Sequence, residues 1–396
     1  MKKSLLAIAA MTAFAGAAQA QSSVTVYGIL DVGYIGGNVR GTSATNGSSQ
    51  KGTYSNIGSS AESTSRLGFK GTEDLGGGLS AFFTLETGLQ PTNATASTFN
   101  NRQTFVGLQD KKIGAISFGT QYTPIHSAVA VTSANQQNNM VGDAIYPIAP
   151  ANSGNQGVGQ FASTSNTDSY TIRTANMVKL QSNNVAGFVG TAFYTANNQD
   201  TTQTGVGTAT TLGGNNNQNG WGIGVNYTWQ KLLVTANYQA LNSRQSSINA
   251  AVGATNGPAI WSNATGGTNV RDNQMYFAAT YDFGILKAYG QYINRKATSQ
   301  ITSNDFVSRT AQQIGVRSFI TPKIEAWASG GTGRYDSFGT ANPTVNFTAY
   351  QLGANYWLSK RTNLYTIFGS TQQSSASSSQ PSVGANNYAA GVRHTF

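Results

Sequence analysis

The two histidines of the chain are the first residues to consider for catalytic or metal chemistry. His126 lies in "PIHSAV" beside Ser127, and His394 lies two residues before the last one. A hydrolase needs a nucleophile and a positioned base, but adjacent residues on an extended segment point apart. The chain has no cysteine, and two isolated histidines do not have metal-ligand spacing. The sequence therefore predicts neither an enzyme nor a metal or cofactor site.

Basic residues that alternate with apolar ones are stronger candidates for function. In "SRLGFKG" a period of two places Arg66 and Lys70 on one face of a strand, opposite Leu67 and Phe69. Such a row of cations does no covalent chemistry. If it lined a water-filled space, it would attract anions.

Two further stretches repeat this arrangement. In "NRQTFVGL" the alternation places Gln103 and Phe105 on the apolar face and leaves Arg102 on the other. In "TIRTANMVKL" Arg173 and Lys179 share a face, opposite the apolar residues at 178 and 180. We expect these basic residues to face away from lipid, because an Arg or Lys on the lipid face at the bilayer midplane costs about 2–4 kcal/mol.

The composition indicates an exported protein with little conventional core. The first twenty residues contain Lys2 and Lys3, an apolar run from Leu5 and an Ala-Gln-Ala ending, which predicts a signal peptide over 1–20 and a mature domain over 21–396. The formal net charge is +10, but the basic residues are spread singly, so nothing indicates nucleic-acid binding. Only 10% of residues are charged, and the mean hydropathy is −0.27. The chain is also too rich in Tyr, Phe and Val to be disordered.

The segment "WGIGVNYTW" at 221–229 shows what the strands of this chain look like. Trp221, Ile223, Val225, Tyr227 and Trp229 alternate with small or polar residues. Aromatic residues at both ends of an apolar face suit the two interfaces of a membrane. The alternative for a single strand of this kind is a soluble β-sandwich.

The order of turns and loops decides between these alternatives. Seven short turns are predicted at 73–78, 110–112, 182–184, 230–231, 282–284, 321–323 and 359–361. They alternate with eight long polar segments, roughly 36–60, 91–99, 123–167, 197–219, 244–271, 297–307, 334–345 and 372–385. This pattern predicts sixteen strands of about ten residues in an all-β transmembrane barrel. A sheet in lipid must close on itself because lipid cannot hydrogen-bond its edges.

Several motifs together resemble a known family. "SRLGFKGTEDLGGGLSAFFTLETGL", "FVGL", "FGTQY", "YWLSKRTNLY" and "GVRHTF" are similar to general porins of Gram-negative bacteria, in the branch found in Burkholderia- and Neisseria-like bacteria. The resemblance implies a homotrimer of sixteen-stranded barrels, with outer-membrane lipid and lipopolysaccharide as surroundings. It also implies that the third outer loop folds into the pore and that small hydrophilic solutes and ions diffuse through.

The resemblance also suggests which residues set selectivity. Similar porins carry a ladder of arginines facing the inserted loop, and Arg66, Arg102 and Arg173 match it, whereas Thr120 replaces a further arginine. Glu86 matches an inward acidic position, and Asp31 is a further acidic candidate for the lumen. The third loop contains Asp143, with Asp168 at its far end. More basic than acidic charge predicts weak anion selectivity. The alternative is that individual charges form salt bridges in the wall and only set the barrel geometry.

Other functions stay open at this stage. A substrate-specific channel of the same fold would share every strand and differ in the width and lining of its pore. An adhesin would use the long polar loops, but no specific binding motif occurs in them. Tyr122 and Tyr146 are weaker candidates for the pore lining, because Tyr is common throughout the chain and often belongs to an interfacial belt.

The last residues keep a period of two up to Phe396. We expect 386–396 to form the final strand and to pair with the first, at Val24–Tyr34. In similar outer-membrane proteins a final aromatic residue is a signal for the assembly machinery. His394 occupies a position where other branches have Tyr, and histidine there suits the branch named above.

Overall fold

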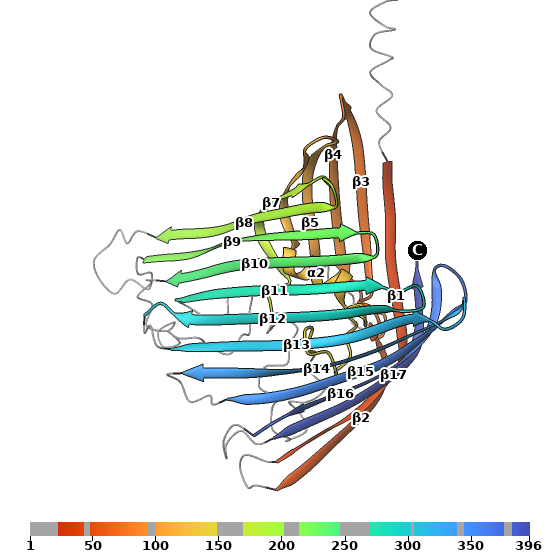
Figure 1. The fold of residues 1–396 in the computed structure, drawn as a ribbon. Coiled ribbons are helices and arrows are strands. Elements are labelled where there is room, and N and C mark those ends of the chain that lie inside the picture. Colours follow the sequence, from red (N-terminus) through yellow and green to blue (C-terminus); the bar gives the residue numbers. More distant parts are fainter. Residues whose placement is uncertain are drawn as a thin grey trace, which may run out of the picture.

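One antiparallel sheet closes on itself around a wide lumen in the computed structural model (Figure 1). The structure describes residues 23–42, 48–93, 100–148, 169–201, 214–245, 269–301, 305–338, 344–375 and 382–396. The predicted signal peptide lies outside these residues. The barrel closes where β1 (Ser23–Thr42) pairs with β17 (Val383–Thr395), from Ile29 opposite Thr395 to Gly41 opposite Val383. The predicted pairing of the last strand with the first is therefore confirmed.

The seventeen strand segments occupy sixteen positions around the barrel. Residues 32–42 of β1 pair with β2 (Ser49–Ser59), and residues 23–29 of β1 pair with β3 (Arg66–Gly76). Because both pair with the same strand, β2 and β3 together form one membrane-spanning strand with a break at 60–65. This confirms the sixteen-stranded barrel. The other strands are β4 (Leu79–Gly88), β5 (Asn100–Asp110), β6 (Gly114–Tyr122), β7 (Arg173–Ser182), β8 (Phe188–Thr201), β9 (Gly214–Trp229), β10 (Leu232–Gln245), β11 (Val270–Asp282), β12 (Lys287–Ser299), β13 (Phe306–Phe319), β14 (Ile324–Phe338), β15 (Val345–Trp357) and β16 (Thr362–Gln373).

The predicted turns are confirmed, but several predicted loops are shorter than expected. All seven short turns join consecutive strands at the expected places. The strands run further on the loop side, so that β1 reaches Thr42 and β9 begins at Gly214, inside segments that were expected to be loops. These extensions are rich in Gly and Asn, which have weak strand propensity. Pairing with the neighbouring strands holds them in the sheet all the same.

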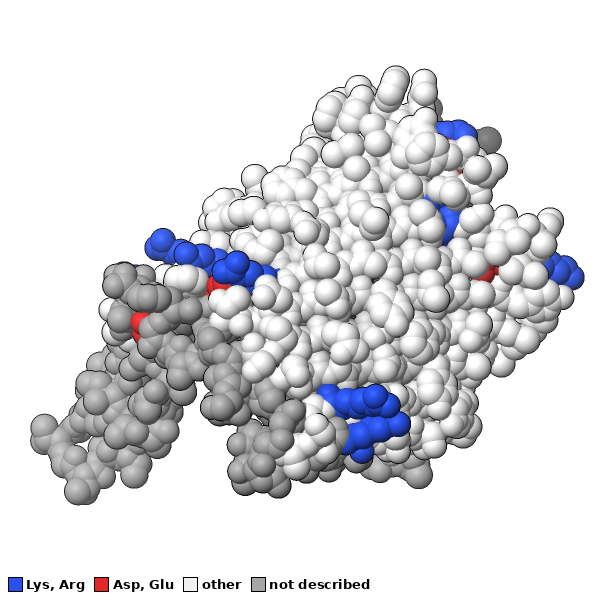
Figure 2. Space-filling view, turned by 60° about the horizontal axis from the view of Figure 1, so that its bottom comes forward, with Lys and Arg blue, Asp and Glu red and all other residues white. Residues whose placement is uncertain are grey.

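Side chains alternate between a lipid-facing surface and the lumen. Trp221, Ile223, Val225 and Trp229 are 45%, 54%, 41% and 58% exposed, respectively, as the lipid-facing set should be. On the face shown in Figure 2, Lys and Arg lie toward the two rims, and a band without charges separates them. Among the described residues no helix is both long and apolar enough to cross a membrane.

Candidate functional site at the constriction of the barrel

The third loop enters the barrel as a short helix. α2 (Pro124–Thr132) lies inside the barrel and contacts β9, β10, β11 and β12 (Figure 1). Thr123 caps the helix, because its hydroxyl accepts a hydrogen bond from the backbone N–H of His126. Proline at the first helical position suits the helix start, where its missing N–H leaves no hydrogen bond unmade. The segment 123–148 therefore narrows the lumen, and we call it the inserted segment.

The inserted segment is fixed to the far wall by buried polar contacts. The amide groups of Asn138 and Gln351 exchange two hydrogen bonds of 2.5 and 3.0 Å. Arg309 donates to the Ala144 carbonyl at 2.5 Å. Gly369 allows a close approach here, because a Cβ atom at this position would lie 1.7 Å from the Val141 carbonyl oxygen. These contacts fix the inserted segment in one position.

Asp143 does not line the lumen, contrary to the expectation from the sequence. Its carboxylate is 2% exposed and accepts hydrogen bonds from Asn135 Nδ2 at 2.7 Å and from the backbone N–H groups of Ile145 and Tyr146 at 2.7 and 2.8 Å. The carboxylate thus closes a tight turn of the inserted segment, and its charge is used within the protein. Asp168 lies outside the described residues.

The three arginines of the predicted ladder meet around one carboxylate on the opposite wall. Arg102 Nε lies 2.7 Å from Glu86 Oε1, and Arg66 Nη1 lies 3.8 Å from Glu86 Oε2. Arg173 donates to the Arg102 carbonyl at 3.1 Å. The group, which we call the arginine cluster, contains three guanidinium groups and one carboxylate. It carries a net charge of +2.

Tyr122 also belongs to the arginine cluster. Its hydroxyl accepts a hydrogen bond from Arg102 Nη2 at 2.7 Å, and the Arg173 guanidinium lies 5.6 Å from the centre of its ring. Sequence reasoning gave Tyr122 little weight because tyrosines are so common in this chain. The position of Tyr122 directly before the inserted segment could have indicated that it lies at the constriction.

A β-bulge positions Arg102 and corrects the predicted faces of β5. Asn101 pairs with Thr87 and Gln103 pairs with Glu86, so Arg102 is an extra residue on its strand. The bulge shifts the alternation by one, and the large apolar residues exposed on β5 are Val106 and Leu108. Gln103 and Phe105 therefore lie on the lumen side, and their predicted lipid-facing placement was wrong.

The remaining predicted residues lie elsewhere on the inner wall. The Lys179 amino group lies 6.0 Å from the centre of the Phe105 ring, and the Lys70 amino group lies 5.5 Å from that of Tyr27. Asp31 is fully buried and accepts hydrogen bonds from the Tyr365 hydroxyl at 2.7 Å and the Glu62 N–H at 2.8 Å. Asp31 thus holds the break between β2 and β3.

Sequence reasoning missed a second set of arginines on the inner wall, two of which, Arg309 and Arg317, bind the inserted segment. Arg295 pairs with Asp272 at 2.6 Å, and Arg317 pairs with Glu325 at 2.5 Å. Arg317 also donates to the Ala134 carbonyl at 2.8 Å. Arg309 and Arg317 occupy lumen-facing positions of the alternation in "FVSRTAQQIGVRSF". That pattern could have identified them.

The side of the inserted segment that remains open to the lumen carries no charge. Among residues 123–148 the exposed ones are Ser127, Ala130, Val131 and Gln136. The cluster faces a hollow of about 350 Å³ whose lining includes Thr64, Gln90, Arg102 and Arg173. Within the described part of the chain, no group of three or more His, Cys, Asp or Glu could hold a metal ion. The arrangement can attract anions but contains no nucleophile with a positioned base.

His126 stays neutral in the folded protein. Burial is the main cause that lowers its pKa to about 3, and the nearby charges of Arg173, Arg102 and Arg66 act in the same direction. Its ring lies 4.2 Å from the ring of Tyr122, centre to centre. The histidine therefore adds no charge to the lumen and serves as packing between α2 and the arginine cluster.

Acidification should loosen the inserted segment through His126. The lowered pKa means that the unfolded segment binds a proton near pH 6.5 and the docked segment only near pH 3. The contribution of His126 to docking is thus complete above pH 6.5 and decreases as the pH falls toward 3. We expect more frequent current fluctuations in single-channel records at pH 4.5 than at pH 7.5. His126→Gln should show a smaller difference between the two pH values, and an unchanged difference would contradict this role.

Removing the guanidinium of Arg309 should also release the inserted segment. Arg309→Met leaves the Ala144 carbonyl and the hydroxyls of Ser169 and Tyr335 without this donor. Each buried group left unsatisfied costs about 1–3 kcal/mol. We expect a larger and noisier single-channel conductance with an intact barrel. Arg334→Met is the matched control, because Arg334 is exposed on β14, and an effect of equal size there would contradict the assignment.

A closed transmembrane barrel whose lumen is charged and narrowed by an inserted segment is typical of outer-membrane channel proteins. The family model described as Gram-negative porin matches residues 7–376, so the chain belongs to that family. It is 35% identical over 271 residues to an outer membrane porin protein of Bordetella pertussis, a match covering 64% of this chain and 63% of that protein. The chain therefore matches slightly less than two thirds of this relative's length.

Solved structures share the fold. The anion-selective porin from Comamonas acidovorans superposes with a TM-score of 0.67 at 24% identity, covering 95% of this chain and all of that one. A trimer form of OmpT from Vibrio cholerae gives a TM-score of 0.60 at 15% identity, covering 95% of this chain and 99% of that one. Membership of the Gram-negative porin family places the chain in the outer membrane.

Proposed function

We propose that the barrel is a general diffusion channel with a weak preference for anions. One observation carries this proposal: the arginine cluster holds three guanidinium groups and one carboxylate, and it lies opposite a segment that exposes only Ser127, Ala130, Val131 and Gln136. Basic groups in a constriction favour anions. The structurally similar Comamonas porin is described as anion-selective, which supports the same ion preference.

Planar-bilayer recording of the purified protein tests this function. We expect a conductance that rises with salt concentration without saturating, and a reversal potential in a KCl gradient that indicates modest chloride preference. Saturation, together with block by one solute at low concentration, would instead identify a substrate-specific channel. A reversal potential on the cation side would overturn the anion preference.

We further propose that the channel is a homotrimer whose subunits meet along the low wall. Strands β3–β6 have only 9 to 11 residues. Their outer face exposes Phe69, Phe83, Val106 and Phe118. The OmpT neighbour solved as a trimer supports this assembly. Native mass spectrometry of the protein extracted in mild detergent should show three copies, and a monomer as the only species would contradict the proposal.

The remaining surface and the chain ends complete the proposed picture. We expect outer-membrane lipid and lipopolysaccharide to cover the tall wall, formed by the longer strands β8–β14. We expect the assembly machinery to bind the last strand through Phe396 and His394. His394 is exposed, as expected for such a contact, and its Nδ1 lies 2.8 Å from the Thr362 hydroxyl. Removal of residues 1–20 would make Gln21 the first residue, which N-terminal sequencing of the exported protein can test.

A further inference from the structure

The inserted segment crosses the inner wall along a single row of paired residues. Gly315 of β13 pairs with Ser329 of β14, and Ser329 pairs with Gln351 of β15. Gln351 in turn pairs with Gly369 of β16. These four residues therefore stand at one height on the wall, and we call them the seat row. Neighbouring strands lie about 4.8 Å apart, so the row spans about 14 Å.

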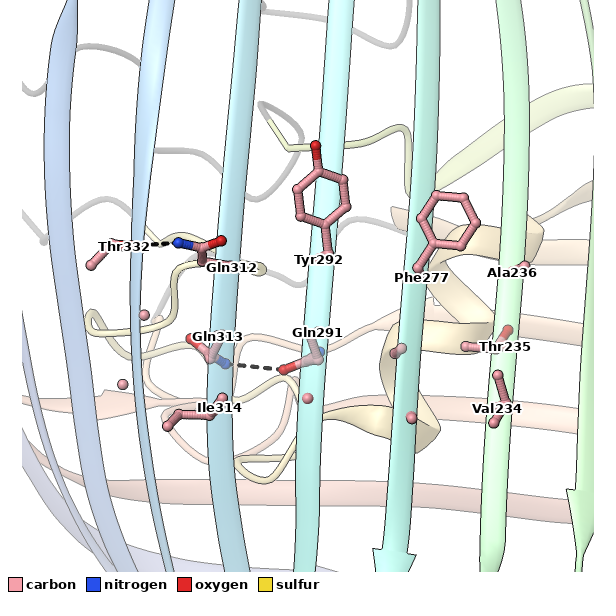
Figure 3. Close-up of a pocket in the computed structure, with 15 residues that line it drawn as sticks. Val234, Thr235, Ala236, Phe277, Gln291, Tyr292, Gln312, Gln313, Ile314 and Thr332 are labelled. Atoms are coloured by element: carbon pink, nitrogen blue, oxygen red, sulfur yellow. Dashed lines mark hydrogen bonds between the residues drawn. The ribbon is translucent and has the colours of Figure 1, made fainter.

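The seat row lies on the lumen face of the wall. Ile314, which Figure 3 labels, is 73% exposed on the outer face, so the next residue, Gly315, faces inward. At the other end of the row Phe368 is exposed on the outer face, and its neighbour Gly369 is buried. Gln351, between the two glycines, is fully buried. The inserted segment covers the row from the lumen side.

Both glycines of the seat row touch the inserted segment. A Cβ atom added at Gly315 would lie 2.7 Å from Ala134 Cβ, and one added at Gly369 would lie 1.7 Å from the Val141 carbonyl oxygen. A Cβ atom added at Gly142 of the segment would lie 3.0 Å from the Gly369 Cα atom. The backbone of the segment thus rests directly on the backbone of the wall, with no space for a methyl group between them.

Hydrogen bonds tie the segment to the wall at the same row. Besides the two bonds that it exchanges with Asn138, the Gln351 amide donates to the Val141 carbonyl at 3.1 Å. Near Gly315, the bond from Arg317 to the Ala134 carbonyl holds the other end. A segment pushed away from the wall by an added methyl group would stay tied to it, and the lumen is the space into which it can shift.

We propose that Gly315 and Gly369 set the width of the pore by letting the inserted segment lie directly on the wall. This inference rests on the proposed diffusion function. The arginine cluster lies across the lumen, so a displacement of the segment from the seat row narrows the passage between them. Ordinary contacts of a Cβ atom begin at 3.4 Å, so alanine requires a displacement of about 1.7 Å at position 369 and of about 0.7 Å at position 315.

Liposome swelling with sugars of increasing size tests this role. In Gly369→Ala the swelling rate with a trisaccharide, relative to a pentose, should fall by about threefold or more, because passage depends on the pore diameter. Gly315→Ala should cause a smaller decrease, and the KCl conductance of both variants should decrease in the same order. Heat-modifiable migration on gels verifies that each variant has folded.

Gly290→Ala is the matched control. It makes the same change on the outer face of the barrel, where Gly290 lines the hollow of about 860 Å³ that Figure 3 shows. A Cβ atom added there would meet no atom of the described chain within 4 Å. This variant should have the wild-type sugar profile and conductance.

Exchanging a methyl group between segment and wall tests the contact at Gly315. The double variant Gly315→Ala with Ala134→Gly moves the methyl group from the segment to the wall, so it should recover the wild-type sugar profile. A Cβ atom at Gly315 would also lie 3.1 Å from the Ala328 carbonyl oxygen of the wall. Failure of the double variant to recover would show that the wall contact causes the effect, which would overturn the assignment of Gly315.

Other outcomes would overturn the proposal as a whole. Wild-type sugar profiles in folded Gly369→Ala and Gly315→Ala would show that the glycines do not set the pore width. A larger and noisier conductance would show that the segment detaches, so that the hydrogen bonds and not the close contact set the width. If Gly369→Ala does not assemble, Gly315→Ala and its double variant decide. A wild-type barrel that passes no sugar would contradict the diffusion function, and the KCl conductances would still test the seat row.

Discussion

Replacing Arg66, Arg102 and Arg173 by glutamine should move the reversal potential of the channel toward cations. The change removes three positive charges from the cluster and leaves Glu86 without its 2.7 Å partner. Two unit charges 4 Å apart interact by about 1 kcal/mol in water. We therefore expect the ratio of chloride to potassium permeability to fall by about fivefold, measured in a KCl gradient near 0.1 M. The shift should be smaller at 1 M salt because of screening.

Two further measurements separate selectivity from barrel geometry. Arg334→Gln with Lys360→Gln removes exposed charges outside the lumen and should leave the reversal potential unchanged. Glu86→Gln should increase the preference for anions. If the triple variant keeps the wild-type reversal potential at 0.1 M salt, the arginines are only structural and the selectivity proposal is wrong.

Deleting Phe396 should strongly reduce the amount of assembled channel. The backbone N–H of Phe396 donates to the Gly28 carbonyl, and its carbonyl accepts from the Gly28 N–H, both at 3.1 Å. Its ring lies over Gly28, where an added Cβ atom would be 2.3 Å from the Phe396 ring. The deletion removes the last pair of hydrogen bonds at the closure and the terminal aromatic side chain. Quantifying the heat-modifiable form in isolated outer membranes measures the effect.

The few assembled molecules should conduct normally, since the Phe396 ring is exposed and packs over Gly28, outside the arginine cluster. Phe396→Tyr keeps an aromatic terminus and both backbone hydrogen bonds, so it should assemble close to the wild-type level. Wild-type amounts of the deletion variant would show that neither the terminal pairing nor an aromatic signal is needed.

The barrel could be predicted from the sequence because lipid imposes a simple rule on every strand. Apolar residues at every second position and seven short turns determined strand number, strand order and closure. The lengths of the strands could not be predicted in the same way. Residues such as Gly214 and Asn215 have low strand propensity, yet they pair with β8 because the neighbouring strand supplies the hydrogen bonds.

The constriction was predictable only in part. Alternation and family resemblance identified Arg66, Arg102 and Arg173, which the structure brings together. The bulge at Arg102 left no signal in the alternation, so Phe105 was assigned to the wrong face. The burial of Asp143 depends on tertiary contacts of the inserted segment, which no local pattern of the sequence contains.

The break between β2 and β3 links the closure of the barrel to its aperture. Asp31, on the first strand, binds this break and also Tyr365 of β16. The break in turn binds the inserted segment, since Asn139 donates to the Ser60 carbonyl at 2.7 Å. A barrel whose last strands have not docked would lack one of the supports that hold its inserted segment. The wall of the barrel and the segment that sets the width of its pore are therefore linked through the same few hydrogen bonds.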